Sequence, residues 1–376
     1  MGCLVYVVSE DGYFLSHRLP MASAAVAAGF RVVVAVRDTG RIGEISALGF
    51  EVVPITLSRG GLGPLGNLRS LWELVRLYRR LRPDVVHHVA LKPVFLGSLA
   101  AVLAGRRRPA VVNALAGMGY LFISRGMKAR LLRAGVVPLL GWLLNRPRGR
   151  VLVQNADDAR FMVEGFGVAP ARVVVIPGSG VDTEALVPSD EPAGPVVFAL
   201  VARMLWDKGV GEFVEAARLL KARGLAVRCR LVGGLDAHNP AAIDRATLDG
   251  WVAEGAIEWA GASDDIPGVW RASHVAVLPS YREGMPKALL EAAACGRPLI
   301  ATDVPGCRAL VEDGVNGLLV PARDGAALAQ AMARLAGDGD LRRRLGARAR
   351  ADAEATYSAG AVAAATGDLY RRLGAD

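Results

Sequence analysis

Short runs of β-branched residues alternate with longer Ala- and Leu-rich stretches along the whole chain. The short runs are almost continuously apolar, which is typical of strands buried on both faces of a parallel sheet, whereas the longer stretches have the spacing of helices. This alternation predicts an α/β fold of parallel sheets with helices on both faces. Strands are expected at 4–9, 31–36, 50–55, 84–89, 110–115, 150–155, 172–178, 195–203, 227–234 and 274–279, and helices at 14–29, 42–48, 68–81 and 211–224.

The alternation is interrupted once and then restarts. A polar, Pro-rich segment spans 182–195, and a fresh apolar strand follows it. A chain of 376 residues also exceeds one typical core. We therefore predict two doubly wound, Rossmann-like domains, 1–185 and 186–357, followed by a helical segment at 358–376. Ligands of such sheets bind outside the carboxyl ends of the strands, so a crevice between two facing domains is the expected site.

The composition indicates an ordered globular protein, with 52% hydrophobic and 22% charged residues. The four cysteines lie in apolar runs without a CxxC pair or a histidine cluster, so we expect inert thiols in a reducing compartment. No signal peptide is evident, and uncharged runs such as 93–105 and 134–145 are shorter than the roughly 20 residues that span a bilayer. These features predict a soluble or peripheral cytoplasmic protein.

The net charge of +9 is concentrated in one block. Residues 76–150 contain 15 Lys and Arg residues and a single acid, Asp84. Such a block could bind nucleic acid, but it lacks interleaved aromatic residues and any helix-turn-helix or zinc-finger pattern. Its part 124–150 is a partly amphipathic, cationic segment that could lie on anionic lipid, and an ordinary solvated basic face is the alternative. The basic residues of that segment include Arg125, Lys128, Arg130 and Arg133.

The sharpest chemical signal is a pair of glutamates near a predicted helix start, in the stretch 280–320. Glu283 lies in the loop after a strand, and Glu291 lies inside the helix that Pro286 begins. Carboxylates accept hydrogen bonds from hydroxyl groups, and a helix N-terminus binds phosphate, so the combination suits a sugar nucleotide. Alternatively, Glu283 only caps the helix and Glu291 is a solvated helix residue.

Two cations occupy an earlier loop of the same half of the chain. Arg203 and Lys208 follow a predicted strand and precede a helix, next to Gly209. Two cations beside a helix N-terminus make a credible clamp for a diphosphate. Because the loops after parallel strands meet at one edge of a sheet, we expect this clamp to lie near Glu283 and Glu291.

The loop after the first predicted strand carries less specific candidates. Gly12 permits a tight turn, and His17 and Arg18 would follow it near a ligand cleft. Lys92 has a similar position, because it follows a strand end and precedes a helix start. For all three charged or titratable residues, an ordinary place on a first helical turn is the alternative interpretation.

The sequence GLGPLG matches a dinucleotide-binding fingerprint through Gly61, Gly63 and Gly66, with Asp84 at about the expected distance. Pro64 removes an N–H that the phosphate would use, and the fingerprint normally follows the first strand of its unit rather than the third. A flexible, glycine-rich loop is therefore the favoured interpretation.

Two further groups resemble metal ligands but lack the required pattern. His87 and His88 are adjacent on a predicted strand, where alternation would let only one of them face the core. Asp338 and Asp340 lie between two helical patterns, where Asp is a common helix cap. We therefore expect no metal site at either place.

Arg203 with Lys208, Glu283 with Glu291, and PGCRALVEDGVNGLLV at 305–320 together strongly resemble the retaining nucleotide-sugar glycosyltransferases of family four. The resemblance covers nearly the whole chain, and VIPGSGVDT at 175–183 matches the segment that closes the family's first domain. It implies the GT-B fold, in which two Rossmann-like domains face a cleft. It also implies that the final helix, here in 358–376, packs back on the N-terminal domain.

The resemblance assigns roles to the matching positions. It implies that Arg203 and Lys208 neutralise the donor diphosphate, that Glu291 binds the ribose hydroxyls and that Glu283 holds the transferred sugar. Many relatives carry a His in the loop that aligns with 113–117, and none is present here, so no His helper is assigned. Catalysis is expected from Arg203, Lys208 and Glu283 without a metal or other cofactor, donor contacts also from Gly12, Gly284, Met285, Pro286 and Glu291, and acceptor contacts from His17, Arg18 and Lys92.

The subgroup that looks closest builds bacterial capsule, O-antigen or protein-glycan sugars on polyprenyl diphosphate, as judged from VVHHVALKP, NALAGMGYLF and LPSYREGMPKALLEAAACGRP. The resemblance implies retaining transfer of a sugar, expected to be an N-acetylhexosamine, from a UDP-sugar to a lipid-diphosphate-linked saccharide. The basic N-terminal domain is expected on the inner face of the cytoplasmic membrane, with no nucleic-acid partner. A GT-B nucleotide-sugar epimerase, a dinucleotide-dependent oxidoreductase and a non-enzymatic basic membrane-binding protein are the alternatives.

Overall fold

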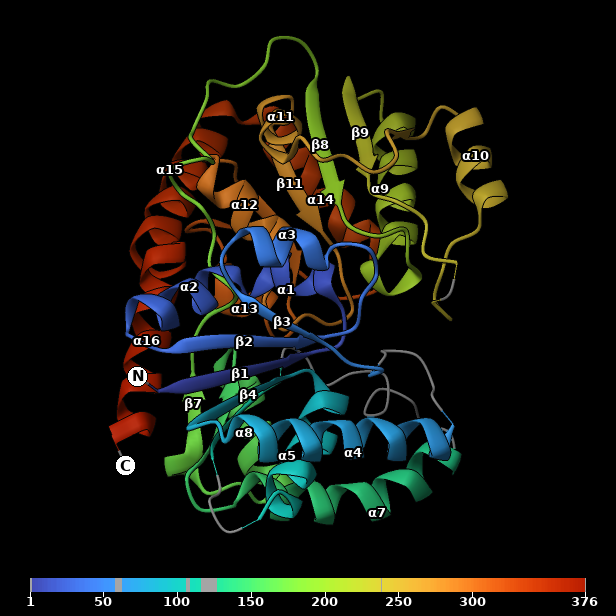
Figure 1. Ribbon diagram of the computed structural model, residues 1–376. Coiled ribbons are helices and arrows are strands. Elements are labelled where there is room, and N and C mark those ends of the chain that lie inside the picture. Colours follow the sequence, from blue (N-terminus) through green and yellow to red (C-terminus); the bar gives the residue numbers. More distant parts are fainter. Residues whose placement is uncertain (1, 58–62, 106–108, 116–126, 238, 376) are drawn as a thin grey trace. The chain divides into compact units, whose positions relative to one another are not determined.

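The computed structural model describes residues 2–57, 63–105, 109–115, 127–237 and 239–375. The chain forms two compact units, which we call unit 1 (Met1–Gly180 with Gly360–Asp376) and unit 2 (Val181–Ala359). Each unit contains one sheet, and neighbouring strands of both sheets pair in parallel (Figure 1). The predicted α/β architecture of two Rossmann-like domains is confirmed.

Unit 1 is built around a seven-stranded sheet of order β3-β2-β1-β4-β5-β6-β7. The order changes direction between β1 and β4, which is the place where doubly wound sheets bind ligands. The strands are β1 (Cys3–Val8), β2 (Arg31–Val36), β3 (Glu51–Pro54), β4 (Val85–Val89), β5 (Ala110–Leu115), β6 (Gly149–Val153) and β7 (Val173–Val175). The described α-helices of this unit are α1 (Asp11–His17), α2 (Leu19–Ala27), α3 (Ile42–Ala47), α4 (Pro64–Leu81), α5 (Leu91–Leu103), α7 (Met127–Leu144), α8 (Ala156–Phe166) and α16 (Ala359–Ala375).

Both faces of this sheet are covered by helices. Alternate residues of β1 belong to two different apolar cores, one shared with α1, α2 and α16 and the other with α4 and α5. His87 and His88 are consequently both fully buried, each on its own face. The expectation that only one of them faces the core is therefore wrong, because a parallel sheet sandwiched between helices has two core faces.

Helix α16 supplies part of the core of unit 1. Tyr370 is fully buried, and its hydroxyl lies 2.5 Å from the hydroxyl of Tyr6 on β1 and 2.5 Å from Nδ1 of His87 on β4. Leu369 and Leu373 pack in the same core. The last helix of the chain is thus joined to the two central strands of the first sheet by apolar packing and hydrogen bonds.

Unit 2 is built around a six-stranded sheet of order β10-β9-β8-β11-β12-β13. Its change of direction lies between β8 and β11, and α9 and α14 cover one face while α12 and α15 cover the other. The strands are β8 (Val196–Val201), β9 (Val227–Val232), β10 (Glu258–Trp259), β11 (Val275–Leu278), β12 (Leu299–Thr302) and β13 (Gly317–Val320). The described α-helices are α9 (Val210–Ala222), α10 (Arg245–Ala253), α11 (Ile266–Arg271), α12 (Lys287–Ala294), α13 (Cys307–Leu310), α14 (Gly325–Gly337) and α15 (Gly339–Thr356).

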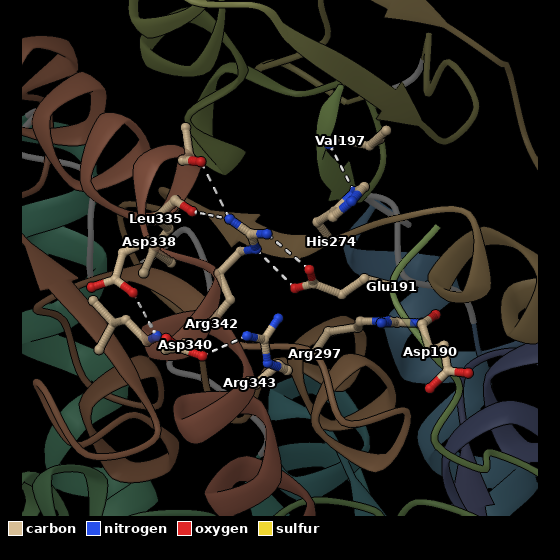
Figure 2. Close-up of polar contacts among 12 residues, drawn as sticks. Asp190, Glu191, Val197, His274, Arg297, Leu335, Asp338, Asp340, Arg342 and Arg343 are labelled. Atoms are coloured by element: carbon tan, nitrogen blue, oxygen red, sulfur yellow. Dashed lines mark hydrogen bonds and ion pairs between the residues drawn. The ribbon is translucent and has the colours of Figure 1, made fainter. Parts of the chain in front are cut away.

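The polar segment at 182–195 is packed on unit 2 rather than left as a free linker. Arg342 of α15 donates to both carboxylate oxygens of Glu191 at 2.8 Å (Figure 2). Arg297 donates to Ser189 at 2.5 Å and to the carbonyl oxygen of Asp190 at 3.2 Å. Because these arginines come from the body of unit 2, they hold the segment to it, and the boundary between the units lies earlier, at Gly180.

Two local expectations change in the first half of the chain. The helix expected at 14–29 is divided into α1 and α2, which meet at Arg18, just before Pro20. Helix α4 begins at Pro64, so Gly66 lies in its first turn and the glycine-rich stretch does not form a loop there, while Gly61 lies outside the described residues. Asp84 accepts a hydrogen bond from the N–H of Cys3 at the amino edge of the sheet. The dinucleotide fingerprint therefore has no structural support.

Within the described residues, no helix combines the length and the apolar character needed to cross a bilayer.

Candidate active site

Two neighbouring strands of unit 2 carry the predicted donor-binding residues. The loop after β8 contains Arg203 and Lys208, and the loop after β11 contains Glu283. These strands lie side by side where the strand order changes direction. The three side chains are therefore at the carboxyl edge of the sheet, at the usual ligand-binding place of an open α/β sheet.

The two loops are packed directly against each other. Gly209 has a φ of 71°, and a Cβ at this position would lie 2.0 Å from the carbonyl oxygen of Pro279. The N–H of Tyr281 donates to the carbonyl oxygen of Asp207 at 3.0 Å. Only glycine accommodates both the positive φ and the close approach, so Gly209 sets the distance between the two loops.

Lys208 and Glu283 form an ion pair across these loops. The Nζ atom of Lys208 lies 2.6 Å from Oε1 of Glu283, and the side chains are 24% and 11% exposed. The hydroxyl of Ser280 donates to the same carboxylate oxygen at 2.6 Å. Among the described residues, no donor is bonded to Oε2 of Glu283. The carboxylate thus has one oxygen held by protein donors and one available to a ligand hydroxyl.

The end of β12 and the loop that follows it also contact the backbone around Glu283. Thr302, at the end of β12, is buried and donates from its hydroxyl to the carbonyl oxygen of Ser280. Gly306 has a φ of 82°, and a Cβ there would lie 2.6 Å from the carbonyl oxygens of Glu283 and Gly284. The backbone around Glu283 is therefore confined by two neighbouring loops as well as by its own.

Arg203 is more exposed and has a different partner. Its side chain is 51% exposed, and Nη1 is ion-paired with the carboxylate of Asp236, in the loop after β9. Asp236 was not predicted as a site residue. Since an exposed ion pair contributes little free energy, a diphosphate can compete with Asp236 for this guanidinium.

Glu291 lies inside α12, one helix turn after Lys287. Lys287 Nζ is 3.5 Å from Oε1 of Glu291, whose side chain is 13% exposed. Burial raises the pKa of Glu291, and the charge of Lys287 opposes this shift only in part. Pro286 is the N-cap of α12 rather than its first residue, so Gly284 and Met285 lie in the loop before the helix. Glu283 and Glu291 thus flank the helix start, as the sequence indicates.

Sequence reasoning missed the side chains that brace the site. Ser280 precedes Glu283 by three residues at the strand end, and this proximity was the signal that could have identified it. Tyr281 donates to Glu212 of α9 at 2.7 Å, and the guanidinium of Arg323 lies 4.4 Å from the centre of its ring. These partners come from distant parts of the sequence, and no local pattern marks them.

The candidates of unit 1 lie at the carboxyl edge of their own sheet. Gly12 is in the first turn of α1, where its N–H bonds to Asp11 Oδ1 at 2.7 Å, so it does not form the expected tight turn. The ring of His17 stacks on Tyr13 with centroids 4.3 Å apart. Lys92 is the second residue of α5, directly after β4, and burial lowers its pKa.

Arg18 does not have the exposed position that the sequence suggested. Its side chain is fully buried where α1 meets α2, and Nη1 donates to the sulfur of Met21 at 3.3 Å. Its Nε atom has no hydrogen-bond partner in the described part of the chain. In this conformation Arg18 belongs to the core, so it cannot contact an acceptor without moving.

The described residues also contain His, Cys, Asp and Glu side chains that could in principle bind a metal ion. No three His, Cys, Asp or Glu side chains are grouped there as metal ligands. Asp338 instead caps α15, because its carboxylate accepts from the N–H of Leu341 at 2.8 Å. The expected capping role of Asp338 is confirmed.

Both halves of the chain match known sequence families. Residues 17–179 match a glycosyl transferase 4-like domain, and residues 195–338 match the glycosyl transferases of group 1. The two matches divide near the boundary between the units.

Similar full-length proteins point in the same direction. An N,N'-diacetylbacillosaminyl-diphospho-undecaprenol α-1,3-N-acetylgalactosaminyltransferase of Campylobacter jejuni is 30% identical and covers 97% of this chain and 98% of its own length. A UDP-Gal:α-D-GlcNAc-diphosphoundecaprenol α-1,3-galactosyltransferase of Escherichia coli is 29% identical over 72% of this chain and 71% of its own.

Solved structures show the fold. The sucrose-phosphate synthase of Thermosynechococcus elongatus superposes with a TM-score of 0.80 at 21% identity and covers 100% of both chains. The HepE protein of Anabaena, solved in complex with UDP, superposes with a TM-score of 0.78 at 18% identity and covers 99% of this chain and 100% of its own. With the two family matches and the Campylobacter relative, these likenesses show that the chain belongs to the group 1, family 4-like glycosyltransferases and has the GT-B fold.

Proposed function

We propose that this glycosyltransferase transfers an N-acetylhexosamine from a UDP-sugar to a saccharide carried on a polyprenyl diphosphate, during the assembly of a cell-surface glycan. The proposal is supported by the activities for which the two bacterial relatives are named, both of which use undecaprenyl-diphosphate-linked acceptors. It is also supported by the arrangement of cations and carboxylates at the carboxyl edge of unit 2. The observation that carries it is the Lys208–Glu283 pair. It places a cation, which can bind phosphate, 2.6 Å from a carboxylate, which can accept hydrogen bonds from sugar hydroxyls.

In this proposal the donor lies along the loops after β8 and β11. Lys208 and Arg203 bind the diphosphate, and Glu291 accepts hydrogen bonds from the ribose hydroxyls. Glu283 uses its free Oε2 to accept a hydrogen bond from the transferred sugar. The loop residues Gly284, Met285 and Pro286 line the path between the sugar and the start of α12.

The reaction breaks the bond between the anomeric carbon and the diphosphate oxygen, and it forms a bond from the acceptor oxygen to the same face of that carbon. Negative charge develops on the diphosphate, where Lys208 and Arg203 stabilise it without a metal ion. The proton of the acceptor hydroxyl passes to the departing phosphate oxygen. Glu283 orients the sugar and stabilises the positive charge that develops at the anomeric carbon. The product therefore keeps the anomeric configuration of the donor.

The acceptor approaches unit 1 in this proposal, with Lys92 and His17 as its nearest candidates. Arg18 would contribute only after leaving its buried position. An exposed face of α4 supports attachment to anionic lipid at the inner face of the cytoplasmic membrane. Leu65, Leu68 and Trp72 are exposed by 83%, 50% and 47% on one side of this helix. The same side carries the arginines Arg69, Arg76, Arg79 and Arg80.

An apolar strip bordered by arginines is suited to the interface of an anionic bilayer. Figure 1 shows α4, α5 and α7 running beside one another, and α7 adds exposed Leu139 and Trp142. In the basic segment 124–150, Arg125 lies outside the described residues. The side chains of Lys128, Arg130 and Arg133 also lie outside the described part of the structure. The membrane proposal therefore rests on α4.

The test is to incubate the purified enzyme with individual UDP-sugars and a polyprenyl-diphosphate-linked saccharide, and to identify products by mass spectrometry. Release of UDP that requires the acceptor is expected, and the proton NMR coupling of the new anomeric centre should match that of the donor. Activity should persist in EDTA. Release of an isomerised UDP-sugar without acceptor would indicate an epimerase instead.

A further inference from the structure

Ser280 is a buried hydroxyl that none of the assigned roles explains. It follows β11, is fully buried and donates its single hydroxyl proton to Oε1 of Glu283 at 2.6 Å. A hydrogen bond to a backbone carbonyl oxygen would satisfy a buried hydroxyl equally well. Here the acceptor is instead the carboxylate predicted to hold the sugar, and a charge-assisted hydrogen bond of this kind is about twice as strong as a neutral one.

The direction of this hydroxyl is fixed by the backbone on both sides. The carbonyl oxygen of Ser280 accepts from Thr302, the carbonyl of the preceding Pro279 is in contact with Gly209, and the following N–H, that of Tyr281, donates to Asp207. Three contacts, one from the end of β12 and two from the loop after β8, therefore hold the residue in place. A side chain held this firmly can orient a partner, because its own freedom is already lost.

Lys208 shares the carboxylate oxygen with Ser280 but has a second task. Its ammonium group has three N–H donors, so it can face a diphosphate as well as Glu283. Once a diphosphate is bound, its charge competes with Glu283 for Lys208. Ser280 is fully buried, and its hydroxyl has Glu283 as its only hydrogen-bond acceptor within the described part of the chain.

We propose that Ser280 is the positioning residue of the donor site: it holds Oε1 of Glu283 and thereby turns Oε2 toward the transferred sugar, also while Lys208 is engaged by the diphosphate. This inference rests on the proposed function, since it assumes a nucleotide-sugar donor. It predicts that Ser280 affects recognition of the sugar and leaves recognition of the nucleotide unchanged.

The experiment compares Ser280→Ala with a matched control, Ser273→Ala. Ser273 is also fully buried and donates one hydrogen bond, to the carbonyl oxygen of Val269 at 2.7 Å, but it precedes β11 at the opposite edge of the sheet. Calorimetry measures the Kd of UDP and of the UDP-sugar for each variant, and steady-state kinetics measures kcat. Thermal unfolding of both variants reports the cost of losing a buried hydroxyl.

For Ser280→Ala we expect an unchanged Kd for UDP, a Kd for the UDP-sugar raised about fivefold, and a kcat lowered about tenfold to a hundredfold. Ser273→Ala should change none of the three by more than about twofold. Ser280→Thr keeps the hydroxyl and should recover most of the loss. In a Glu283→Ala background, Ser280→Ala should add little further loss, because the carboxylate that Ser280 holds is already absent.

Equal effects on UDP and on the UDP-sugar would overturn the inference, and so would additive losses in the double variant. Losses no larger than those of Ser273→Ala would have the same meaning. Failure of the proposed function looks different: the unchanged enzyme would transfer no sugar to any lipid-diphosphate acceptor. The calorimetric comparison still tests Ser280 in that case, because it needs only the donor.

Discussion

Lys208 and Glu283 are 75 positions apart in the sequence, yet their side chains form an ion pair that is less exposed than the Arg203–Asp236 and Lys287–Glu291 pairs. A cation beside the diphosphate acts where negative charge develops in the transition state, so its contribution to the rate exceeds its contribution to binding. Its pairing with Glu283 also connects the phosphate end of the donor site to the sugar end. Substitution of either residue should therefore disturb both ends.

Lys208→Ala is expected to lower kcat by about a hundredfold to a thousandfold, by analogy with the loss of a positioned donor to a developing anion. Steady-state turnover with a verified acceptor measures the effect. Lys221→Ala is the control, because Lys221 is an exposed lysine of the neighbouring α9 that donates to backbone carbonyls. Unchanged turnover in Lys208→Ala would remove this residue from the mechanism.

Protonation of buried histidines should make the protein sensitive to acid. His88 is fully buried, its Nδ1 lies 2.8 Å from Oδ1 of Asn113 and its Nε2 lies 2.9 Å from the hydroxyl of Tyr78. The amide oxygen only accepts, so neutral His88 donates through Nδ1 and accepts through Nε2. Burial lowers its pKa from 6.5 to about 4, and the bond to Asn113 opposes this only in part.

Because the folded pKa lies below the unfolded one, the stability from neutral His88 is complete above pH 6.5 and is lost as the pH falls toward 4. The free energy of unfolding should therefore decrease between pH 7 and pH 4.5, and less steeply in His88→Gln. Urea denaturation at several pH values measures this slope. His17→Gln is the control, and an equal slope in all three proteins would contradict the account.

At the scale of elements, the apolar pattern was a good guide wherever burial decides the structure. The strands of both sheets lie where the β-branched runs are, because a strand covered on two faces needs an unbroken apolar run. The helix expected at 14–29 is interrupted at Arg18. The interruption was not predicted because the apolar residues keep their helical spacing across the position where α1 ends and α2 begins. Helix α4 was expected to start at residue 68 but starts at Pro64. The glycines near its start resemble a loop and concealed the first turn.

The site was predictable in part for the same physical reasons. The sequence shows which residues follow a strand, and the topology of a parallel sheet brings such loops to one edge, so Arg203, Lys208 and Glu283 could be grouped in advance. The pairing of Lys208 with Glu283 and the bracing by Ser280 could not, because they depend on the packing of loops from different strands. Burial of Arg18 was hidden as well, since charged residues are rarely found in a core.

Helix α4 offers a direct test of the proposed membrane surface. Replacing Leu65, Leu68 and Trp72 by Gln should lower partition into vesicles of anionic phospholipid by at least tenfold, since each buried apolar side chain contributes about 1.5–3 kcal/mol. Replacing Arg69, Arg76 and Arg79 by Gln should weaken the salt-sensitive part of the binding. Co-sedimentation with the vesicles measures both effects.

The control for α4 uses apolar residues that are equally exposed elsewhere in unit 1. Val26 and Leu48 are 48% and 53% exposed, and their replacement by Gln should leave vesicle binding unchanged. If both sets of substitutions weakened binding alike, or neither did, α4 would have no special role at the membrane.

At the scale of the whole molecule, the two units differ in how the chain completes them. Unit 2 is one continuous segment, whereas unit 1 needs both ends of the chain. The fragment 181–359 should therefore fold alone and bind UDP nearly as well as the full chain. The fragment 1–180 should be poorly folded, because the absence of α16 uncovers Tyr6 and His87.

Circular dichroism and calorimetry on the separate fragments test this expectation. Joining 1–180 to 360–376 by a short linker should restore a folded unit 1, because Val181 and Ser358 are neighbours in a β-bridge. An unfolded 181–359 fragment, or a stable 1–180 fragment, would contradict the expectation that unit 2 folds alone and that unit 1 requires α16.

The position of Tyr370 has a consequence for the order of events on the ribosome. The first half of the chain leaves the exit tunnel without α16, the helix that closes its core. Its core stays incomplete while residues 181–359 are synthesised. At about 5–20 residues per second, this delay lasts from roughly ten seconds to slightly over half a minute. During that time the apolar face around Tyr6 is open to water, to chaperones and to other nascent chains. The addition of α16 therefore ends the period in which the core of unit 1 is exposed.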